Sequence, residues 1–293
     1  MNFGAIDIGS NAVRLLIRKS CFDKDGKHYF QKISLTRVPI RLGEDVFASG
    51  VIPEEKISKL IKTMKSFRLL MDVNEVDAYR AVATSAMREA KNGEEVLKKV
   101  IKESKIKLEL ISGEEEADLL FTNFNKSGLS KSKTYLYIDV GGGSTEVTLI
   151  KNNKRVQSYS FKIGSVRLLK GKVDEAIWID AKKKIDKMTQ GIRGLVAIGT
   201  GGNINRIYKE SRHSFGEAIY LDEIKNIVSF IGKHSIEERI TKLKLKPDRA
   251  DVIVPAGKIY TTFMSASGAE RMMVPKVGLS DGMINQLHLD SKK

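Results

Sequence analysis

The sequence predicts an α/β protein that consists of two related domains. The first observation is a repeated hairpin: FGAIDIGSNAVRLLI at 3–17 and YLYIDVGGGSTEVTLI at 135–150 are each two β-prone runs joined by a turn. In both, an aspartate ends the first run and a glycine follows two residues later, and the two hairpins are one domain length apart. The second observation is that strand and helix patterns alternate after each hairpin, which is typical of α/β folds. The third is the polar segment NKSGLSKSKT at 125–134, which is expected to link the halves.

The elements after the first hairpin follow from local patterns. A helix is expected at 54–71, where apolar residues recur at three- and four-residue steps, and Pro53 suits its start. Short β-prone runs at 77–83 and 106–111 each lead into a further helical segment. After the second hairpin, a strand is expected at 195–198, followed by a glycine-rich turn and two or three helices.

Length and composition limit the class of protein. With 293 residues the chain can form two domains that each bury a core, and the ranges 1–125 and 126–293 are expected. The longest apolar runs, such as LLI at 15–17, are far shorter than the roughly 20 residues that span a bilayer, so no membrane partner is expected. The N-terminal residues lack the basic flank and cleavage site of a secretory signal. The single cysteine, Cys21, fits a reducing compartment, and a cytoplasmic location is therefore expected.

The chain is strongly basic, with 51 Lys and Arg against 36 Asp and Glu and a formal net charge of +15. Such a charge attracts polyanions: nucleic acid, an acidic membrane surface or a polymeric phosphate. The lysine clusters lie in helix-like segments, where a solvated helix face is their usual explanation. Because no nucleic-acid-binding module is recognisable, specific binding of nucleic acid is not expected.

Three glycine turns at strand ends are the first candidates for chemistry. Their backbone N–H groups can surround an anion without obstruction by side chains, as phosphate binding requires. Glycine is also common in turns for backbone reasons alone, so purely structural turns are the alternative. Neither the P-loop nor the dinucleotide-binding pattern fits, since Ile204 stands where the third glycine of the latter belongs. The expected phosphate-binding residues are Gly9, Ser10 and Asn11 in the first turn, Gly141, Gly142, Gly143, Ser144 and Thr145 in the second, and Gly199, Thr200, Gly201 and Gly202 in the third.

Carboxylates beside these turns are candidates for metal binding. Asp7 and Asp139 end their strands at an expected common cleft and can hold Mg²⁺ directly or through water, whereas simple capping of the turn is the alternative. Glu146 alternates with Val147 and Leu149 and therefore faces away from their apolar side. A carboxylate in that position can orient water or bind the metal, whereas a solvated strand residue is the alternative.

An acidic segment, SGEEEADL at 112–119, opens a predicted helix and is a candidate source of a general base. Ser112 and Glu115 have the spacing of a capping box, and acidic residues suit the start of a helix. Successive helical positions diverge by about 100°, so at most one of Glu114, Glu115 and Glu116 can point into a cleft. That glutamate is expected to activate water.

Eight ordered blocks of the sequence carry a resemblance. They are AIDIGSNAVRLLI (5–17), RLGEDV (41–46), ATSAMR (83–88), ISGEEEADL (111–119), YIDVGGGSTEVTLI (137–150), IGSVRL (163–168), IGTGGNI (198–204) and DRADVIVPA (248–256). With these blocks, essentially the whole chain resembles the exopolyphosphatase/guanosine pentaphosphate phosphohydrolase (Ppx/GppA) family, in a short two-domain form. The resemblance implies two actin-like (ribonuclease H-like) domains with an interdomain cleft. It also implies a hydrolase that releases terminal orthophosphate from polyphosphate or guanosine pentaphosphate.

The resemblance further implies roles for single residues. Glu116 corresponds to the family's general base, and Glu146 is expected to help orient the attacking water. Asp139 and Glu146 correspond to residues with metal and phosphate roles, and Arg14 and Arg88 are expected to contact phosphate. Mg²⁺ is the expected cofactor, and an additional monovalent cation is left open.

Three positions depart from the family's usual residues: Ala12 replaces Ser or Thr, Asp118 replaces Arg, and Asn203 replaces Thr. They leave open an alternative function, a sensor that binds guanosine tetra- or pentaphosphate with little or no catalysis. The C-terminal helical domain of longer members, associated with long-chain binding, has no counterpart here, so short chains are the expected substrates. An actin-like kinase or ATPase is a third interpretation, and a homodimer is left open.

Overall fold

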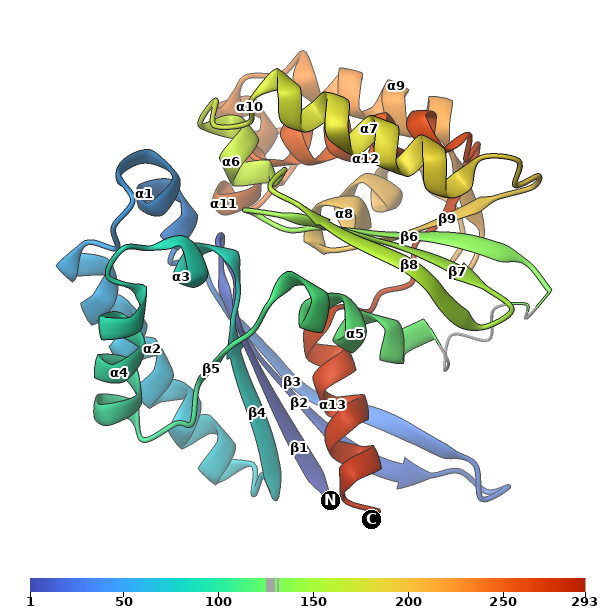
Figure 1. Ribbon diagram of the computed structural model, residues 1–293. Helices are drawn as coiled ribbons and strands as arrows, with labels where there is room; N and C mark the ends of the chain where they lie inside the picture. Colours follow the sequence, from blue (N-terminus) through green and yellow to red (C-terminus); the bar gives the residue numbers. More distant parts are fainter. Residues whose placement is uncertain (125–129, 131, 293) are drawn as a thin grey trace. The chain divides into compact units, whose positions relative to one another are not determined.

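The computed structural model describes residues 1–124, 130 and 132–292, and the chain divides into two compact units (Figure 1). The first unit contains Met1–Asn123 and Gly278–Lys293, and the second contains Phe124–Val277. The expected boundary between residues 125 and 126 lies outside the described residues, as do residues 125–129 and 131 of the expected linker.

The first unit is built on a five-stranded sheet with the order β3-β2-β1-β4-β5. β1, β2 and β3 are antiparallel neighbours, whereas β4 runs parallel to β1 and β5 parallel to β4. Its strands are β1 (Asn2–Ile8), β2 (Val13–Phe22), β3 (His28–Val38), β4 (Ala78–Ala83) and β5 (Glu109–Leu110). Its helices are α1 (Leu42–Ser49), α2 (Glu54–Val73), α3 (Ser85–Glu89), α4 (Gly93–Ser104), α5 (Gly113–Phe124) and α13 (Leu279–Asp290).

The two faces of this sheet are covered by different helices, because successive side chains of a strand point to opposite faces. Gly4 faces α2: a Cβ atom at Gly4 would lie 3.1 Å from the sulfur of Met71. Phe3 faces α13, where its ring packs edge-on against His288 with 5.9 Å between the ring centroids. Asp7 has the same parity as Phe3 and therefore lies on the α13 face of the sheet.

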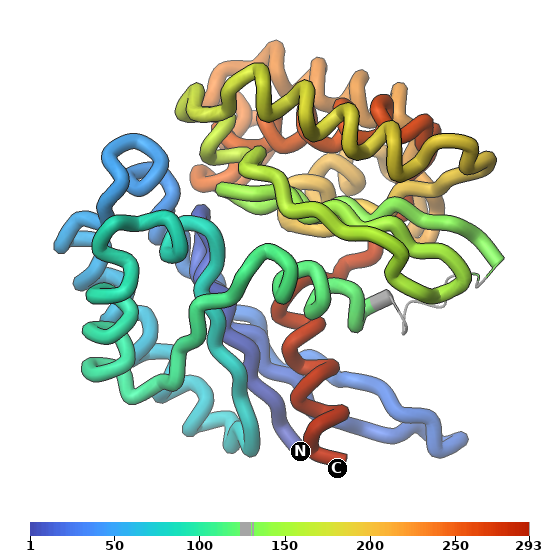
Figure 2. The backbone as a smooth tube through the Cα atoms, in the orientation of Figure 1, coloured from blue at the N-terminus to red at the C-terminus, as the bar shows by residue number. Residues whose placement is uncertain are grey.

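The C-terminal helix α13 belongs to the first unit, which corrects the expected range 126–293 for the second domain. Arg18 of β2 forms an ion pair with Asp281, and the side-chain amide of Asn285 donates to Asn123 Oδ1 at 3.1 Å. Figure 2 shows the backbone returning at its red end to lie along the blue strands of this unit. The local pattern of a helix does not reveal which sheet it covers, so the sequence could not predict this return.

The second unit contains a six-stranded sheet with the order β10-β11-β9-β6-β7-β8. Its strands are β6 (Thr134–Val140), β7 (Thr145–Lys151), β8 (Lys154–Phe161), β9 (Val196–Thr200), β10 (Ala218–Tyr220) and β11 (Arg271–Met273). Its helices are α6 (Ser165–Leu169), α7 (Glu175–Thr189), α8 (Gly202–Glu210), α9 (Leu221–Gly232), α10 (Ile236–Thr241), α11 (Pro247–Ala250) and α12 (Ile253–Ser267).

The two sheets repeat one arrangement. In each, an antiparallel hairpin is extended on one side by a third antiparallel strand, and on the other by a strand parallel to the first: β3-β2-β1-β4 and β8-β7-β6-β9. The predicted α/β class and the predicted repeat of two related halves are therefore confirmed. The expected cleft between the halves stays a prediction.

Helices cover the apolar face of the second sheet. Leu136, Ile138 and Val140 of β6 share one hydrophobic core with Trp178 of α7 and Phe263 of α12. Figure 1 shows α7, α12 and α9 side by side over this sheet. The alternate residues of β6, among them Asp139, point to the opposite face. The packing of Ile138 and Val140 therefore directs the Asp139 carboxylate away from this core.

Several local expectations hold, but one strand is shorter than expected and more helices follow the third glycine turn. In place of two or three helices, the described residues after Gly201 form six, α8 to α13. The helix expected at 54–71 spans Glu54–Val73 and follows Pro53. The run at 106–111 forms a strand only at Glu109–Leu110, because only these residues pair with β4. Among the described residues, no helix is both long and apolar enough to cross a membrane.

Gly282 allows α13 and α5 to approach closely, and this gives a first prediction. A Cβ atom there would lie 2.0 Å from the carbonyl oxygen of Leu119, a backbone atom that no side-chain rotation can remove. Gly282→Ala should therefore lower stability by about 1–3 kcal/mol. Thermal unfolding measures this. As a matched control, Gly232→Ala should not destabilise, because its Cβ would meet only Val254 at 4.0 Å. Equal unfolding temperatures for wild type and Gly282→Ala would contradict the close contact.

Candidate active site

A row of four polar side chains crosses the sheet of the second unit. Strand register places Thr200 beside Asp139, Asp139 beside Glu146, and Glu146 beside Ser160, on β9, β6, β7 and β8. The hydroxyl of Thr200 donates a hydrogen bond to Asp139 Oδ1, and Ser160 Oγ donates to Glu146 Oε1 at 2.8 Å. The two hydroxyls flank and orient the two carboxylates.

The two carboxylates of this row lie on adjacent strands, Glu146 buried and Asp139 partly exposed. Side chains directly opposite each other on antiparallel strands have Cβ atoms about 4.5–5.5 Å apart. Glu146 is 1% exposed, so its charge is poorly screened. Burial raises the pKa of the Tyr260 hydroxyl well above its usual value, and the charge of Asp139 adds to this rise. A pair of like charges in such surroundings favours a bound cation.

The equivalent row of the first unit has the opposite electrostatic character. Register places Val82 beside Asp7, Asp7 beside Arg14, and Arg14 beside Arg37. Arg14 Nη1 lies 3.2 Å from Asp7 Oδ2. Burial raises the pKa of the Asp7 carboxyl, while Arg14 and Arg37 act to lower it. One aspartate and two arginines thus stand where the second unit has two carboxylates and a serine, and this row suits an anion.

The first glycine turn is held by residues of two of the quoted blocks. Gly9 N–H donates to the carbonyl of Ala12 at 3.1 Å, which closes the turn, and Gly43 N–H donates to the carbonyl of Ser10 at 2.8 Å. The hydroxyls of Ser10 and Ser85 share a hydrogen bond of 2.9 Å. Asn11 accepts the N–H of residue 41 at its backbone carbonyl. The turn is therefore fixed from both sides.

The second glycine turn has its carbonyls directed towards α6. The N–H groups of Ser165 and Val166 donate to the carbonyls of Gly141 and Gly142 at 3.0 and 2.9 Å, and Arg167 Nε donates to that of Gly143 at 2.8 Å. A trans peptide directs its C=O and N–H to opposite sides. The N–H groups of the residues that follow these carbonyls, at 142, 143 and 144, therefore point away from α6. Successive backbone N–H groups in a turn are donors of the kind that binds anions.

The two threonines of the predicted phosphate set have hydroxyls that serve the protein. Thr145 donates to the carbonyl of Ile163, and Thr200 donates to Asp139. Both residues are fully buried. Because both hydroxyls already donate within the protein, a phosphate at these positions would have to be bound by backbone N–H groups.

The third glycine turn contains one glycine required by packing and two near the site. A Cβ atom at Gly199 would lie 2.3 Å from the sulfur of Met272, so this glycine allows two strands to pack. Gly201 has φ = 110°, a conformation that disfavours other residues, and its Cβ position lies 3.7 Å from Asp139 Oδ1. At Gly202, a Cβ would lie 2.8 Å from Arg249 Nη2. The last two glycines therefore bring the backbone next to a carboxylate and a guanidinium.

The start of α5 distinguishes the three consecutive glutamates. Ser112 Oγ accepts the N–H of Glu115 at 3.1 Å, which confirms the predicted cap. Glu114 is exposed, and Glu115 Oε1 receives Arg80 Nη2 at 2.5 Å. Glu116 is buried, with 7% of its surface exposed. It is thus the only one of the three that is buried, as a general base in an enclosed site would be.

Arg80 of β4 anchors α5. Its guanidinium donates to Glu115, to Glu109 Oε2 at 2.8 Å and to Gln286 Oε1 of α13 at 2.7 Å. Arg88 of α3 adds a tether, since its Nη1 donates to the carbonyl of Ile111 at 2.6 Å, just before α5. Two arginines thereby hold the segment that carries Glu116.

The predicted metal ligands are divided between the units. Asp7 belongs to the first unit, whereas Asp139 and Glu146 belong to the second. Within the part of the chain that the structure describes, no group of three or more His, Cys, Asp or Glu side chains is arranged to hold a metal ion. The structure therefore brings together one pair, Asp139 and Glu146.

Five polar residues of these surroundings were not identified from the sequence. Arg37 and Ser160 lie on third strands, and their positions depend on strand register, which no local pattern specifies. Arg80 lies in the middle of a strand. Arg167 and Arg249 lie within the blocks IGSVRL and DRADVIVPA, so their place in those blocks was an available signal.

Comparisons with known proteins show the family to which the chain belongs. A model of the Ppx/GppA phosphatase family matches residues 21–290. The chain is 26% identical over 304 aligned positions to exopolyphosphatase 1 of Mycobacterium tuberculosis, which covers 97% of this chain and 87% of that protein. It is 36% identical over 167 residues to a bifunctional 3-dehydroquinate synthase/phosphatase of Fusobacterium nucleatum, which covers 56% of this chain and a quarter of that protein (25%).

A solved structure extends the comparison to the fold. The crystal structure of the Aquifex aeolicus member of the Ppx/GppA family matches with a TM-score of 0.79 and 27% identity, over 100% of this chain and 99% of that one. Family match and fold agree over nearly all of the sequence. The chain belongs to the Ppx/GppA phosphatase family.

Proposed function

We propose that this protein is a phosphoanhydride hydrolase that releases terminal orthophosphate from polyphosphate, with short chains or guanosine pentaphosphate as substrates. The observation that carries the proposal is the pair of equivalent rows with opposite charge: Asp139 and Glu146 in one unit, Arg14 and Arg37 in the other. Transfer of a phosphoryl group to water needs both a cation site and anion-binding groups. The exopolyphosphatase named among its relatives supports this substrate class.

The proposed reaction is in-line hydrolysis. A water oxygen forms a bond to the terminal phosphorus while the bond from that phosphorus to the bridging oxygen breaks, and the shortened chain leaves with the bonding electrons. Glu116 accepts the proton of the water, and Glu146, oriented by Ser160, helps to align the water. The N–H groups of the second glycine turn donate to the phosphate oxygens as charge develops on them.

The residues present fit a divalent cation. Asp139 and Glu146 offer oxygen ligands on adjacent strands, which suits Mg²⁺, an ion that is often held by one or two carboxylates together with substrate phosphates. Such an ion would supply positive charge to the phosphate oxygens. Asp7, which pairs with Arg14, is proposed to orient that arginine.

A nucleotide sensor without turnover is the second candidate. One observation favours it: Asp118, which replaces a usual arginine, lies on the exposed face of α5, two residues after Glu116. Asp118 is turned about 200° around the helix from Glu116, so its charge acts only by lowering the attraction of this surface for a phosphate chain. The cytoplasmic location, the monovalent cation and the homodimer all stay predictions.

The first functional prediction concerns Glu116. Glu116→Gln should reduce phosphate release from tripolyphosphate with Mg²⁺ about 10²–10⁴-fold, because the variant cannot accept a proton. Glu114→Gln removes the same charge from the exposed neighbour and should keep wild-type activity. Chelation with EDTA should abolish release, and Mg²⁺ should restore it. Wild-type protein that binds guanosine pentaphosphate but releases no phosphate from either substrate would refute the hydrolase and favour the sensor.

The second prediction tests Arg37. Arg37→Gln should raise KM for tripolyphosphate several-fold with a smaller change in kcat, because the arginine is proposed to bind phosphate equally in ground and transition states. Lys32→Gln is the matched control: it removes a charge from an exposed position of the same strand and should leave KM unchanged. If both variants behave alike, Arg37 has no specific role.

The third prediction concerns the Arg80 anchor. Arg80→Met should lower kcat on the order of tenfold or more with little change in KM, because α5 loses the contacts that position Glu116. Arg80→Lys should restore only part of this activity, since one ammonium cannot reproduce the planar fork. Arg68→Met, at an exposed ion pair on α2, should leave kcat unchanged. A loss of stability with unchanged kcat would show that Arg80 is merely structural.

A further inference from the structure

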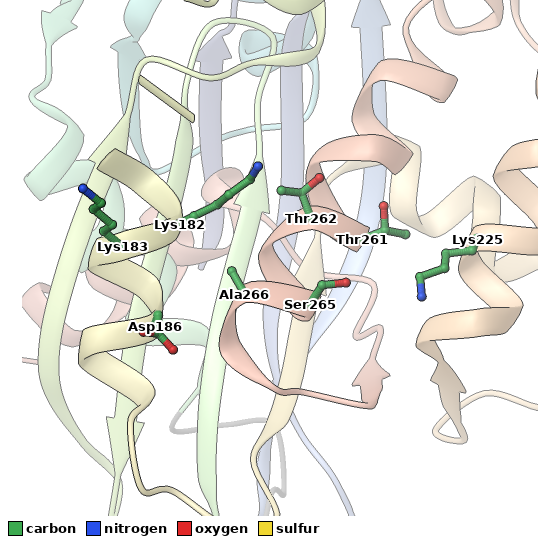
Figure 3. Close-up of a pocket in the computed structure, with 8 residues that line it drawn as sticks. All are labelled: Lys182, Lys183, Asp186, Lys225, Thr261, Thr262, Ser265 and Ala266. Atoms are coloured by element: carbon green, nitrogen blue, oxygen red, sulfur yellow. The ribbon is translucent and has the colours of Figure 1, made fainter. Parts of the chain in front are cut away.

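A groove lies on the outer helical layer of the second unit, with a volume of about 670 Å³. Its floor is α12, with Thr261, Thr262 and Ser265, and its walls are α7 and α9. Figure 3 shows Lys182 of α7 and Lys225 of α9 extending towards α12 from opposite sides. The groove combines hydroxyls below with ammonium groups at its sides.

The packing of α12 explains why the groove exists. Tyr260, Phe263 and Met264 are fully buried on the side of α12 that faces the sheet. The residues between them therefore turn outwards, and these are small and polar. At Gly257, one turn earlier, α9 comes so close that a Cβ would lie 2.3 Å from a methyl group of Val228. The groove opens where this tight contact ends.

The polar groups of the groove can serve a ligand. Within the described residues, Lys182 and Lys183 form no ion pair, and the hydroxyls of Thr262 and Ser265 form no hydrogen bond. Lys225 pairs with Asp222 at 2.9 Å, but half of the lysine side chain and most of the aspartate are exposed, so this pair contributes little. Asp186 on the rim is one acidic residue against three lysines.

The groove is separate from the candidate active site. The hydroxyl of Tyr260, on the inner side of α12, donates to the carbonyl of Thr200 and accepts the N–H of Val140. Thr262, two residues later and about 200° around the helix, lines the groove on the outer side. The two places therefore lie on opposite sides of the same helix.

We propose that this groove is a second binding site for a chain of phosphoryl groups, such as a short inorganic polyphosphate or the phosphates of a nucleotide. Two ammonium groups that approach from opposite sides match an anion with several charges along its length, and hydroxyls donate to phosphate oxygens. The volume suits a ligand of this size. Binding here does not require turnover, so the inference is independent of the proposed function.

The test uses the full chain and follows the methyl NMR signals of Thr261 and Thr262 during titration with tripolyphosphate. The signals should shift in a saturable manner, and the shift should weaken at high salt because the contacts are exposed. Lys182→Gln combined with Lys225→Gln should weaken the affinity about fivefold or more. Lys187→Gln with Lys233→Gln removes two exposed charges outside the groove, one on α7 and one at the residue that follows α9, and should leave the affinity unchanged.

Two outcomes would overturn the proposal: signals that do not move, or equal weakening by both double variants, which would indicate only general attraction to a basic protein. A parallel titration with guanosine triphosphate distinguishes the two sources of the phosphate chain. Tighter binding than tripolyphosphate would identify a nucleotide as the ligand, whereas equal affinity would show that the phosphate chain alone is bound.

Discussion

The register between the two strands of each hairpin is the constraint on which the rest of the site depends. Arg14 is seven positions after Asp7, and Glu146 is seven positions after Asp139. In both hairpins this spacing makes the two residues cross-strand partners. A turn one residue longer or shorter would move one partner to the opposite face of the sheet. The glycine turns therefore have two tasks, since they present N–H groups and also fix which side chains meet.

The hairpin occurs twice, in two complementary environments. In the second unit the partner of the aspartate is a glutamate, and the row is acidic. In the first unit the partner is Arg14, followed by Arg37, and the row is basic. The same strand pairing thus carries opposite charges, depending on whether the residue opposite the aspartate is an arginine or a glutamate. The pairing itself requires only the glycine turn and apolar residues on the other face of the sheet. The electrostatic division follows from side chains, whereas the geometry follows from the fold.

Local patterns in the sequence were sufficient for the repeated hairpin and for the elements predicted beside it, because both depend on neighbouring residues. The aspartates and glycine turns were visible for the same reason. The strands β3, β8, β10 and β11 were not predicted. Glu116 was assigned by family resemblance, and its burial agrees with that choice. Arg37 and Ser160 were missed because their positions depend on register across β2–β3 and β7–β8, and each of these pairings contains an irregularity, at Ile17/Arg18 and Leu149/Ile150.

The return of α13 to the first unit has a consequence for synthesis on the ribosome. The second unit is one continuous segment, Phe124–Val277, and all of it is made before Gly278. The first unit lacks the helix that covers the Phe3 and Asp7 face of its sheet until α13 emerges. Domains often mature in the order in which they are translated. Of these two units, the one that is started first is completed last, so a ribosome that stalls before α13 is made would leave an apolar sheet face open to chaperones.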